Sequence, residues 1–247
     1  MTTWQQRTLL LMGEEKANRL ANAHVLVVGV GGVGAYAAEM LCRAGVGKLT
    51  IVDADEVTPT NINRQLPALH STIGQKKVDV LAARFRDINP NVALTLLPLF
   101  LTGVEKEALI FEKEDENVRL SISTFDFIVD AIDTITPKVS LIAGALRWQI
   151  PIVSSMGAGA KTDITKIQFS DIWDTYHCGL SKAVRHGLKQ VGLQAKKLPV
   201  VFSAEQVDRK AVITVEGERN KKTTTGTVSY MPATFGCYLA QYVLDRL

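Results

Sequence analysis

The chain has 247 residues, of which 47% are hydrophobic and 21% charged, and its formal net charge is +3. This composition is typical of one globular domain with a sizeable core, and the mild charge excludes neither a nucleic-acid partner nor a small-molecule substrate. The three cysteines, Cys42, Cys178 and Cys237, form no C-x-x-C pair, which argues against a disulfide framework or a four-cysteine zinc site. Because we find no signal-peptide pattern and no apolar run of about 18 residues, we expect a cytoplasmic protein with no membrane partner.

Strands and helices alternate along the first part of the chain. Short apolar runs predict buried parallel strands, and apolar residues at helical spacing predict the helices between them. We expect strands at His24–Gly29, Lys48–Asp53, Val92–Leu97, Phe125–Ala131 and Ile152–Ser155, helices at Gln5–Leu20, Val33–Arg43, Gln75–Ile88 and Pro137–Trp148, and a charge-rich helix or loop insertion at Glu105–Arg119. This alternation predicts a Rossmann-like α/β fold with a doubly wound, mostly parallel sheet.

After Met156 the runs become shorter and more polar. Here we expect strands at Lys166–Ser170, Val200–Ser203, Ala211–Val215 and Gly226–Tyr230, and helices at Cys178–Gln190 and Ala233–Leu247. We interpret residues 1–247 as a single domain. Residues 21–155 would form its nucleotide-binding part, and residues 156–247 would extend the sheet with additional strands and build the acceptor side of the site.

A glycine-rich loop, G-V-G-G-V-G, stands between the first predicted strand and the helix that follows it; its glycines are Gly29, Gly31, Gly32 and Gly34. Glycines allow a tight turn and let backbone N–H groups approach phosphates at a helix N-terminus. Asp53 ends the next predicted strand, where an acid can hold a ribose hydroxyl. The motif alone fits NAD or FAD as well as ATP.

The segment after Asp53 favours a triphosphate. It supplies acids, amides and cations close to one glycine-rich loop, namely Asp55, Asn61, Arg64, Gln65 and Lys77. A triphosphate needs cationic side chains and a metal more than a dinucleotide does, because charge must be neutralised at the phosphorus under attack. Arg64 and Lys77 have a simpler interpretation as solvated surface charges.

Taken together, G-x-G-G-x-G, D-x-D, N-x-N-R-Q, G-x-x-K and a later D-A-I-D resemble the motifs of the ubiquitin-activating, molybdopterin-synthase-adenylating (ThiF-like) superfamily, over roughly residues 7–155. The resemblance implies an ATP-dependent, carboxylate-activating enzyme of the ligase type, with adenylyltransferase-like chemistry. It implies a triphosphate bound by Gly32, Asn61, Arg64 and Lys77, a ribose held by Asp53, and Mg²⁺ held by Asp133. For Asp133, capping of the helix that starts near Thr134 or Thr136 is the alternative.

The N-terminal R-x-x-L-L-x-G segment contains Arg7. In proteins of this superfamily such an arginine reaches into the partner subunit, so the resemblance also implies a homodimer and a catalytic role for Arg7. A lone arginine on an N-terminal helix is more often a surface residue.

The second half is similar to the tRNA threonylcarbamoyladenosine dehydratases, in the stretches Ser155–Asp163, Leu180–Arg185, Val200–Glu205 and Gly226–Ala233. This similarity implies ATP-dependent activation of the threonyl carboxylate and closure of a ring, with net loss of water, in the tRNA anticodon loop. The alternative is adenylation of the C-terminus of a ubiquitin-like or sulfur-carrier protein. The single cysteine of Tyr176-His177-Cys178, where such enzymes have a zinc-binding pair, argues against a protein substrate.

Basic residues are concentrated between positions 182 and 222. Lys182, Arg185 and Lys189 fall at i, i+3 and i+7, so they share one face of a predicted helix and are candidates for tRNA binding. A solvated helix face is the simpler interpretation. Four questions stay open: whether the protein is only a nucleotide-binding module, whether an acyl-adenylate or an acyl-phosphate forms, whether Cys178 is a nucleophile, a sulfur-relay residue or a packing residue, and whether a sulfur-transfer partner exists.

Overall fold

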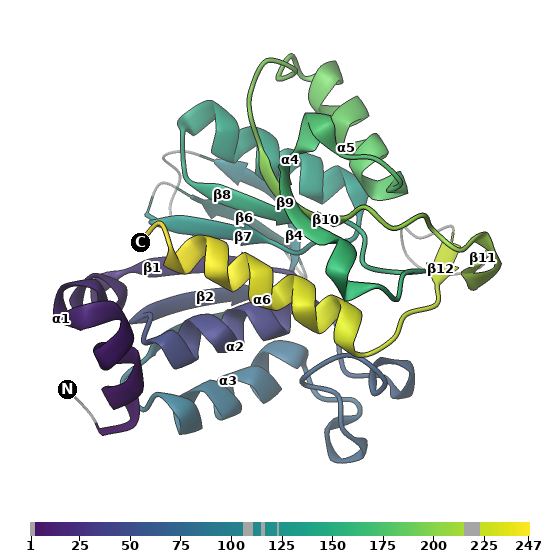
Figure 1. The fold of residues 1–247 in the computed structure, drawn as a ribbon. Helices are drawn as coiled ribbons and strands as arrows, with labels where there is room; N and C mark the ends of the chain where they lie inside the picture. Colours follow the sequence, from purple (N-terminus) through teal and green to yellow (C-terminus); the bar gives the residue numbers. More distant parts are fainter. Residues whose placement is uncertain (1–2, 106–110, 115–116, 123, 215–222) are drawn as a thin grey trace.

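The computed structural model describes residues 3–105, 111–114, 117–122, 124–214 and 223–247. Within these ranges, seven strands form one sheet (Figure 1). From edge to edge, the strands are β3 (Ala93–Leu97), β2 (Lys48–Val52), β1 (His24–Val28), β7 (Phe127–Asp130), β8 (Ile152–Ser155), β10 (Pro199–Ser203) and β9 (Ile167–Asp171). Every neighbouring pair is parallel except β10 and β9, which are antiparallel.

The strand order reverses between β1 and β7. The chain moves outward from β1 to β2 and β3, and then returns to the other side of β1 for β7, β8 and β10. In open parallel sheets, ligands bind outside the carboxyl ends of the strands at such a switch point. The predicted Rossmann-like sheet, with additional strands from the second half, is confirmed.

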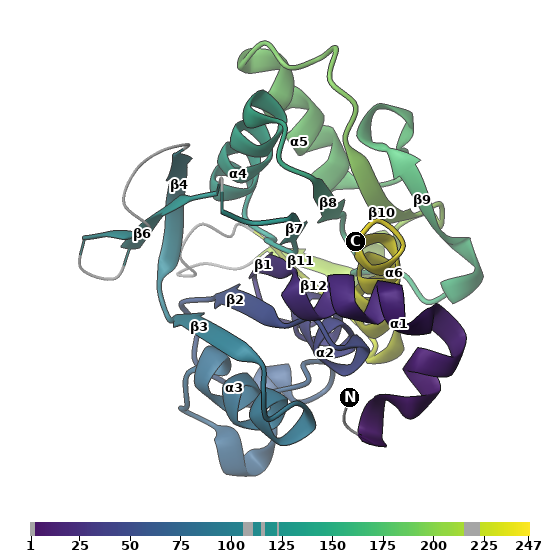
Figure 2. The ribbon, with the colours of Figure 1, turned by 90° about the vertical axis from the view of Figure 1, so that its left-hand side faces the viewer.

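Helices cover both faces of the sheet (Figure 2). On one face lie α2 (Gly34–Ala44), α3 (Lys77–Ile88) and α6 (Tyr230–Leu244), and on the other lie α4 (Ile135–Trp148) and α5 (Gly179–Gln190). Successive side chains of β1 point to opposite faces, so Val25 and Val27 join the first core while Leu26 and Val28 join the second. No described helix is both long and apolar enough to cross a bilayer.

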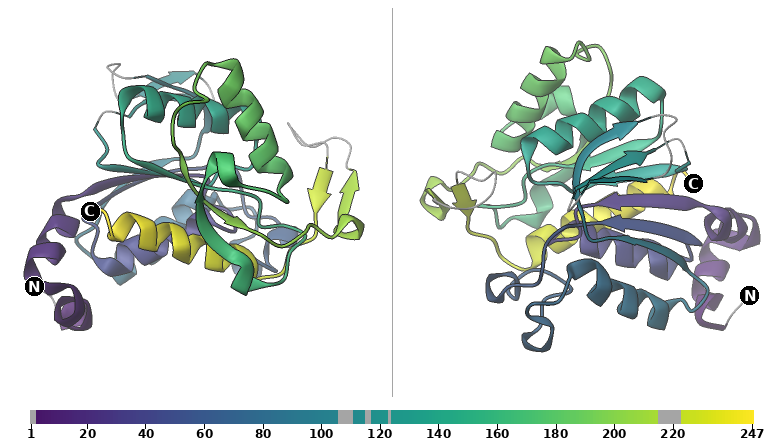
Figure 3. Two further views of the ribbon diagram at one scale, coloured as in Figure 1. Left: turned by 45° about the horizontal axis from the view of Figure 1, so that its top comes forward. Right: turned by 180° about the vertical axis from the view of Figure 1, so that it is seen from behind.

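The N-terminal helix α1 (Gln6–Asn22) lies at one end of the molecule, beside the end of the chain (Figure 3). It is kinked at Gly13, whose φ of 78° and ψ of 163° are not helical. The second half of the helix is fixed to the domain, since Leu20 is buried and Arg19 Nε donates to the Leu247 carbonyl oxygen over 3.0 Å. The described 3-10 helices are η1 (Thr3–Gln5), η2 (Pro59–Asn61), η3 (His70–Thr72), η4 (Ile164–Lys166), η5 (Ile172–Asp174) and η6 (Arg209–Ala211).

Two predicted segments are wrong. Within Glu105–Arg119 the described residues form strands, not a helix or loop: β4 (Phe100–Glu105), β6 (Asn117–Ser121) and β5 (Phe111–Glu114) make a second, three-stranded sheet, and positions 106–110 and 115–116 lie outside the described residues. Apolar and polar residues alternate at 118–121, which is typical of a strand, but the many charged residues of the segment mask this pattern.

The strand predicted at Gly226–Tyr230 is also absent from its described residues. The strand there is β12 (Thr223–Thr225), which pairs with β11 (Val212–Thr214), and α6 already begins at Tyr230. Pro232 is therefore inside the first turn of α6, where a proline is tolerated because the N–H groups of that turn have no helical acceptor.

Candidate functional site

The glycine-rich loop leaves β1 and enters α2 through two backbone contacts that only glycine permits. Gly29 has a φ of +83°, and a Cβ on it would lie 2.8 Å from the Ala131 carbonyl oxygen. A Cβ on Gly34 would lie 1.8 Å from the Gly29 carbonyl oxygen. The loop therefore sits directly on the turn that follows β7, and the N-terminus of α2 opens at the switch point.

Asp53 follows β2 and is bonded to the same loop. Its Oδ2 accepts the Val30 N–H over 2.8 Å, and its Oδ1 accepts the Asp55 N–H over 2.9 Å. Burial raises the pKa of the Asp53 carboxyl above its ordinary value, although the nearby Lys77 ammonium opposes that rise. The carboxylate thus lies at the position from which Rossmann proteins hold a ribose.

Lys77, the first residue of α3, is buried rather than solvated. Its Nζ lies 2.7 Å from Asp55 Oδ2 and 3.9 Å from Asp53 Oδ1, and only 4% of the residue is exposed. The interpretation of Lys77 as a surface charge is therefore wrong. The structure brings the cation and the two acids together, with Asp55 itself exposed.

The segment that contains η2 lies against the glycines. A Cβ on Gly31 would be 3.6 Å from Gln65 Nε2, and a Cβ on Gly32 would be 3.7 Å from Arg64 Cγ. Arg64 is half-buried, and its Nη1 donates to the Thr60 carbonyl oxygen over 2.8 Å. Gln65 Oε1 is buried and lacks a hydrogen-bond partner among the described residues, as expected for an atom that meets a ligand.

Asn61 is buried in the same segment. Its Oδ1 accepts the Thr58 N–H over 3.1 Å, so this oxygen shapes the turn. The segment thus brings Arg64 and Gln65 to the glycine loop, whereas the Asn61 oxygen stabilises the turn at η2.

Asp133 is exposed in the turn after β7, the strand beside β1. Thr134 is the N-cap residue of α4, its side chain makes no capping hydrogen bond, and Asp133 directly precedes it. Among the described residues no three His, Cys, Asp or Glu side chains form a metal-binding group. A single carboxylate fits Mg²⁺, which binds through one or two carboxylates together with phosphate oxygens and water, but it does not fit a metal held by protein ligands alone.

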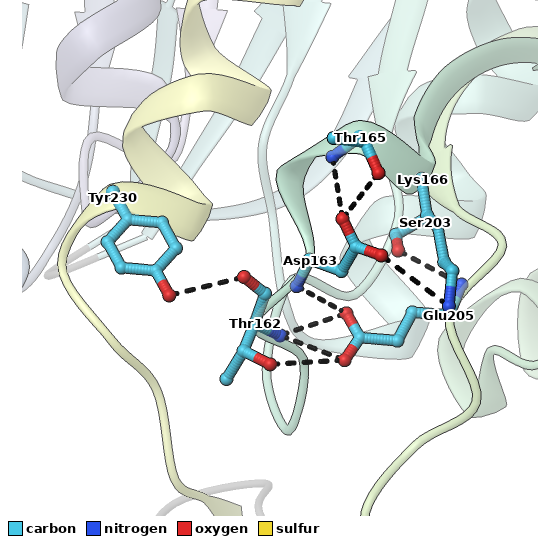
Figure 4. A network of polar contacts seen from close by, with 7 residues as sticks. All are labelled: Thr162, Asp163, Thr165, Lys166, Ser203, Glu205 and Tyr230. Carbon is cyan, nitrogen blue, oxygen red and sulfur yellow. Dashed lines mark hydrogen bonds and ion pairs between the residues drawn. The ribbon is translucent and has the colours of Figure 1, made fainter.

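The loop Gly157–Lys166 leaves β8 and is held by Glu205, which follows β10 (Figure 4). Glu205 accepts the N–H groups of Thr162 and Asp163, the shortest of these bonds being 2.9 Å and 2.8 Å. On the other side of the loop, the Tyr230 hydroxyl at the start of α6 donates to the Thr162 carbonyl oxygen over 3.2 Å.

Lys161 is the buried lysine of this loop. It is only 2% exposed, its Nζ donates to the Ser203 carbonyl oxygen over 2.6 Å, and burial lowers its pKa below the ordinary value. Glu205, Lys161 and Tyr230 belong to the stretches that resemble the dehydratases. No local pattern singles them out as site residues, because their partners lie elsewhere in the chain.

Comparison with known proteins identifies the family of this chain. The sequence profile of the ThiF family matches residues 5–247. The chain belongs to the ThiF family. A tRNA threonylcarbamoyladenosine dehydratase of Bacillus subtilis is 38% identical over 98% of this chain and 93% of its own length. One of Escherichia coli is 36% identical over 99% of this chain and 94% of its own.

A solved structure agrees with this assignment. The crystal structure of the E. coli tRNA N6-threonylcarbamoyladenosine dehydratase in complex with ATP superposes with a TM-score of 0.82 at 32% sequence identity, and the match covers 100% of this chain and 95% of that one. The similarity therefore includes the second half of the ThiF chain as well as its nucleotide loop.

In this ThiF chain Cys178 is the N-cap residue of α5. Its Sγ accepts the Ser181 N–H and the Gly157 N–H, each over 3.4 Å. The thiol thus links the start of α5 to the loop after β8, in agreement with a positional role. Cys42 is buried, and Cys237 is exposed.

The three basic residues of α5 are not equivalent. Lys182 and Lys189 are exposed, whereas Arg185 is half-buried and its Nη1 donates to the carbonyl oxygens of Ile172 and Thr175 over 3.1 Å and 2.9 Å. Arg185 therefore differs from the two lysines on the same face of α5, because its guanidinium fixes α5 to η5, and tRNA binding by these residues stays a prediction.

Arg7 is exposed on the first half of α1, before the kink. Leu10 and Leu11 beside it are 82% and 84% exposed. The structure does not bring Arg7 to the nucleotide-loop residues of its own subunit through any described contact, so its catalytic role stays a prediction.

Proposed function

We propose that this protein uses ATP to dehydrate threonylcarbamoyladenosine in the tRNA anticodon loop, which closes a ring. The observation that carries this proposal is the near-complete match to dehydratases in sequence and structure, together with a switch point at which the glycine loop, Asp53 and Lys77 meet. ATP is the nucleotide in the E. coli relative.

The reaction has two steps. In the first, the threonyl carboxylate attacks a phosphorus of ATP, and pyrophosphate or ADP leaves. In the second, the carbamoyl nitrogen attacks the activated acyl carbon, AMP or phosphate leaves, and a proton is lost. The nucleophile and the electrophile belong to the same nucleoside, so proximity is built into the substrate and no enzyme nucleophile is needed.

The residues of the site have distinct proposed roles. Asp53 binds the ribose, the backbone at Gly31 and Gly32 binds phosphates, and Arg64 and Lys77 neutralise the charge that develops there. Asp133 would hold a Mg²⁺ ion, which would supply positive charge to neutralise the phosphates during attack.

Three further parts of the proposal concern two partners and the location of the protein. Lys182 and Lys189 contact tRNA phosphates, since both are exposed on a helix beside the loop that Glu205 holds. The exposed Leu10 and Leu11 form part of a homodimer interface, from which Arg7 reaches the site of the partner subunit. A tRNA substrate supports a location in the cytoplasm.

The test is incubation of the protein with ATP, Mg²⁺ and bulk tRNA that contains threonylcarbamoyladenosine, followed by mass spectrometry of the nucleosides. Loss of the mass of one water supports the proposal, and the nucleotide product, AMP or ADP, identifies the activated intermediate. Asp133→Ala should abolish turnover while the circular dichroism spectrum is unchanged. No change in nucleoside mass, with pyrophosphate exchange that depends on a small protein, would favour the alternative, adenylation of a protein tail.

A further inference from the structure

A fully buried ion pair lies directly beneath the turn that carries Asp133. Asp130 is the last residue of β7 and Lys138 belongs to the beginning of α4; both are 0% exposed, and Lys138 Nζ lies 2.8 Å from Asp130 Oδ2. Ser154 at β8 donates its hydroxyl to the same Oδ2 over 2.6 Å. The pair therefore joins two strands of the sheet and one helix.

Both members of the pair bind the backbone of Ile132. Asp130 Oδ1 accepts the Ile132 N–H over 3.1 Å, and Lys138 Nζ donates to the Ile132 carbonyl oxygen over 3.0 Å. Ile132 immediately precedes Asp133, so Asp133 follows a residue whose backbone N–H and carbonyl oxygen are both bound by buried charged groups.

The preceding residue fixes the turn against the glycine loop. The Ala131 N–H donates to the Val28 carbonyl oxygen over 2.9 Å, and the Ala131 carbonyl oxygen is in the close contact with Gly29 described above. The turn at residues 131–133 is thus fixed on one side by the ion pair and on the other by the phosphate loop.

A buried ion pair is a costly way to stabilise a core, because well-packed apolar residues of similar size are often at least as stabilising. Its distinctive property is that charge-assisted hydrogen bonds fix direction as well as distance. We propose that Asp130 and Lys138 are positioning residues that hold Asp133 in place to bind the magnesium of ATP. This inference rests on the proposed assignment of Asp133 to magnesium.

The experiment measures the dissociation constant of a non-hydrolysable ATP analogue by isothermal titration calorimetry, with the full-length protein, over a series of free Mg²⁺ concentrations. The readout is the Mg²⁺ concentration at half-maximal effect, which needs no turnover. This midpoint concentration of Mg²⁺ should rise about 10–100-fold in the variant Lys138→Met and in the double variant Asp130→Asn with Lys138→Met. A change of this size is typical for residues that orient metal ligands. Affinity for the analogue in EDTA should stay within about twofold of the wild type, because the glycine loop and Asp53 are unaltered.

Two further variants keep the test decisive. Ser154→Ala removes one hydrogen bond to Asp130 and no charge, so this variant should fold even if the other two do not. It should raise the Mg²⁺ midpoint by a smaller factor than they do. Glu39→Gln is the matched control: Glu39 is a buried carboxylate of α2 that pairs with Arg43 and Arg84, and its loss should lower the melting temperature without moving the midpoint.

Asp133→Ala separates the two levels of inference. If Asp133→Ala removes the magnesium effect while the Lys138, double and Ser154 variants keep the wild-type midpoint, the positioning role is overturned and the metal assignment stands. If Asp133→Ala itself leaves the midpoint unchanged, the metal assignment fails, and the positioning role fails with it.

Discussion

Val30 donates its backbone N–H to the carboxylate of Asp53 over 2.8 Å, so the glycine-rich loop and the proposed ribose-binding acid form one hydrogen-bonded unit. Burial raises the pKa of the Asp53 carboxyl. A protonated carboxyl is a poorer acceptor for both the amide and a ribose hydroxyl. Protonation of this one group should therefore disturb the loop and the ribose contact together.

The first prediction concerns pH. ATP affinity should fall on acidification, and the fall should begin at a pH above the titration range of an ordinary aspartate, whose pKa is about 3.9. The stability of the ligand-free protein should respond with the opposite sign: because the folded-state pKa is the higher one, Asp53 favours the folded state more as pH falls through that value.

Calorimetric titration of ATP across a pH series checks this prediction. Asp53→Asn is the control, because an amide does not titrate. The affinity of this variant for ATP should be lower than that of the wild type and should depend less on pH. Equal pH dependence in the two proteins would exclude Asp53 as the titrating group.

The second prediction compares two glycines that share a left-handed backbone. Gly29 and Gly74 both have a φ of +83°, but a Cβ on Gly29 meets the Ala131 carbonyl oxygen, whereas a Cβ on Gly74 meets nothing within 4 Å. Gly74→Ala should reduce the free energy of unfolding by about 1–2 kcal/mol, the cost of the left-handed conformation. Gly29→Ala should cost about 2–5 kcal/mol because overpacking is added. Denaturant titration measures the free energy of unfolding of both variants. Equal decreases in the two would contradict a steric clash with the Ala131 carbonyl oxygen.

The third prediction concerns Glu205. Its carboxylate binds two backbone N–H groups of the loop after β8, and hydrogen bonds to a charged group contribute about 1.5–3 kcal/mol each. Since Glu205 is half-buried, Glu205→Ala should reduce stability by about 2 kcal/mol, or about 4–8 °C in melting temperature. Turnover of tRNA should fall while ATP affinity is retained. Asp208→Asn, which alters an exposed carboxylate at η6, is the control; an equal loss of turnover there would argue against a specific role for Glu205.

The fourth prediction separates tRNA contact from structure on α5. Lys182→Ala with Lys189→Ala should weaken tRNA binding and reduce the slope of log affinity against log salt by about 2, since each phosphate contact contributes about 0.9. Arg185→Ala should mainly lower the melting temperature, because its guanidinium binds backbone carbonyl groups. Filter binding at several salt concentrations checks both. Replacement of the exposed Lys48 and Arg86 by alanine should have little effect on tRNA affinity. If it weakened tRNA binding as much as the loss of Lys182 and Lys189, the effect would come from the overall charge of the protein and not from contacts at α5.

Local patterns predicted the parts of the site that are local in sequence. The glycine loop and Asp53 could be identified because a strand, a tight turn and a helix follow one another within a short segment. The proximity of Lys77 to Asp53 and Asp55 followed from a family motif. The burial of Lys77 did not, since the sequence around a lysine at the start of a helix does not show which other segments will cover it.

The remaining contacts depend on how the chain returns to the sheet. Glu205 binds residues that lie 43 and 42 positions earlier, and the partners of Arg185 lie in η5 and directly after it rather than on its own helix. The Asp130–Lys138 pair is hidden for a different reason: a lysine four residues after the N-cap of an amphipathic helix resembles an exposed residue until the helix is docked. Its full burial is a property of the packed sheet.

The position of α6 has a consequence for how the protein is made. Its side chains Phe235, Leu239 and Val243 belong to the same core as Val25 and Val27 of β1. During synthesis, β1 emerges from the ribosome long before the helix that completes its cover. The apolar face of the first half must therefore stay open to water or to a chaperone until α6 has been released. Premature termination within α6 should consequently yield an aggregating polypeptide and not a working nucleotide-binding fragment.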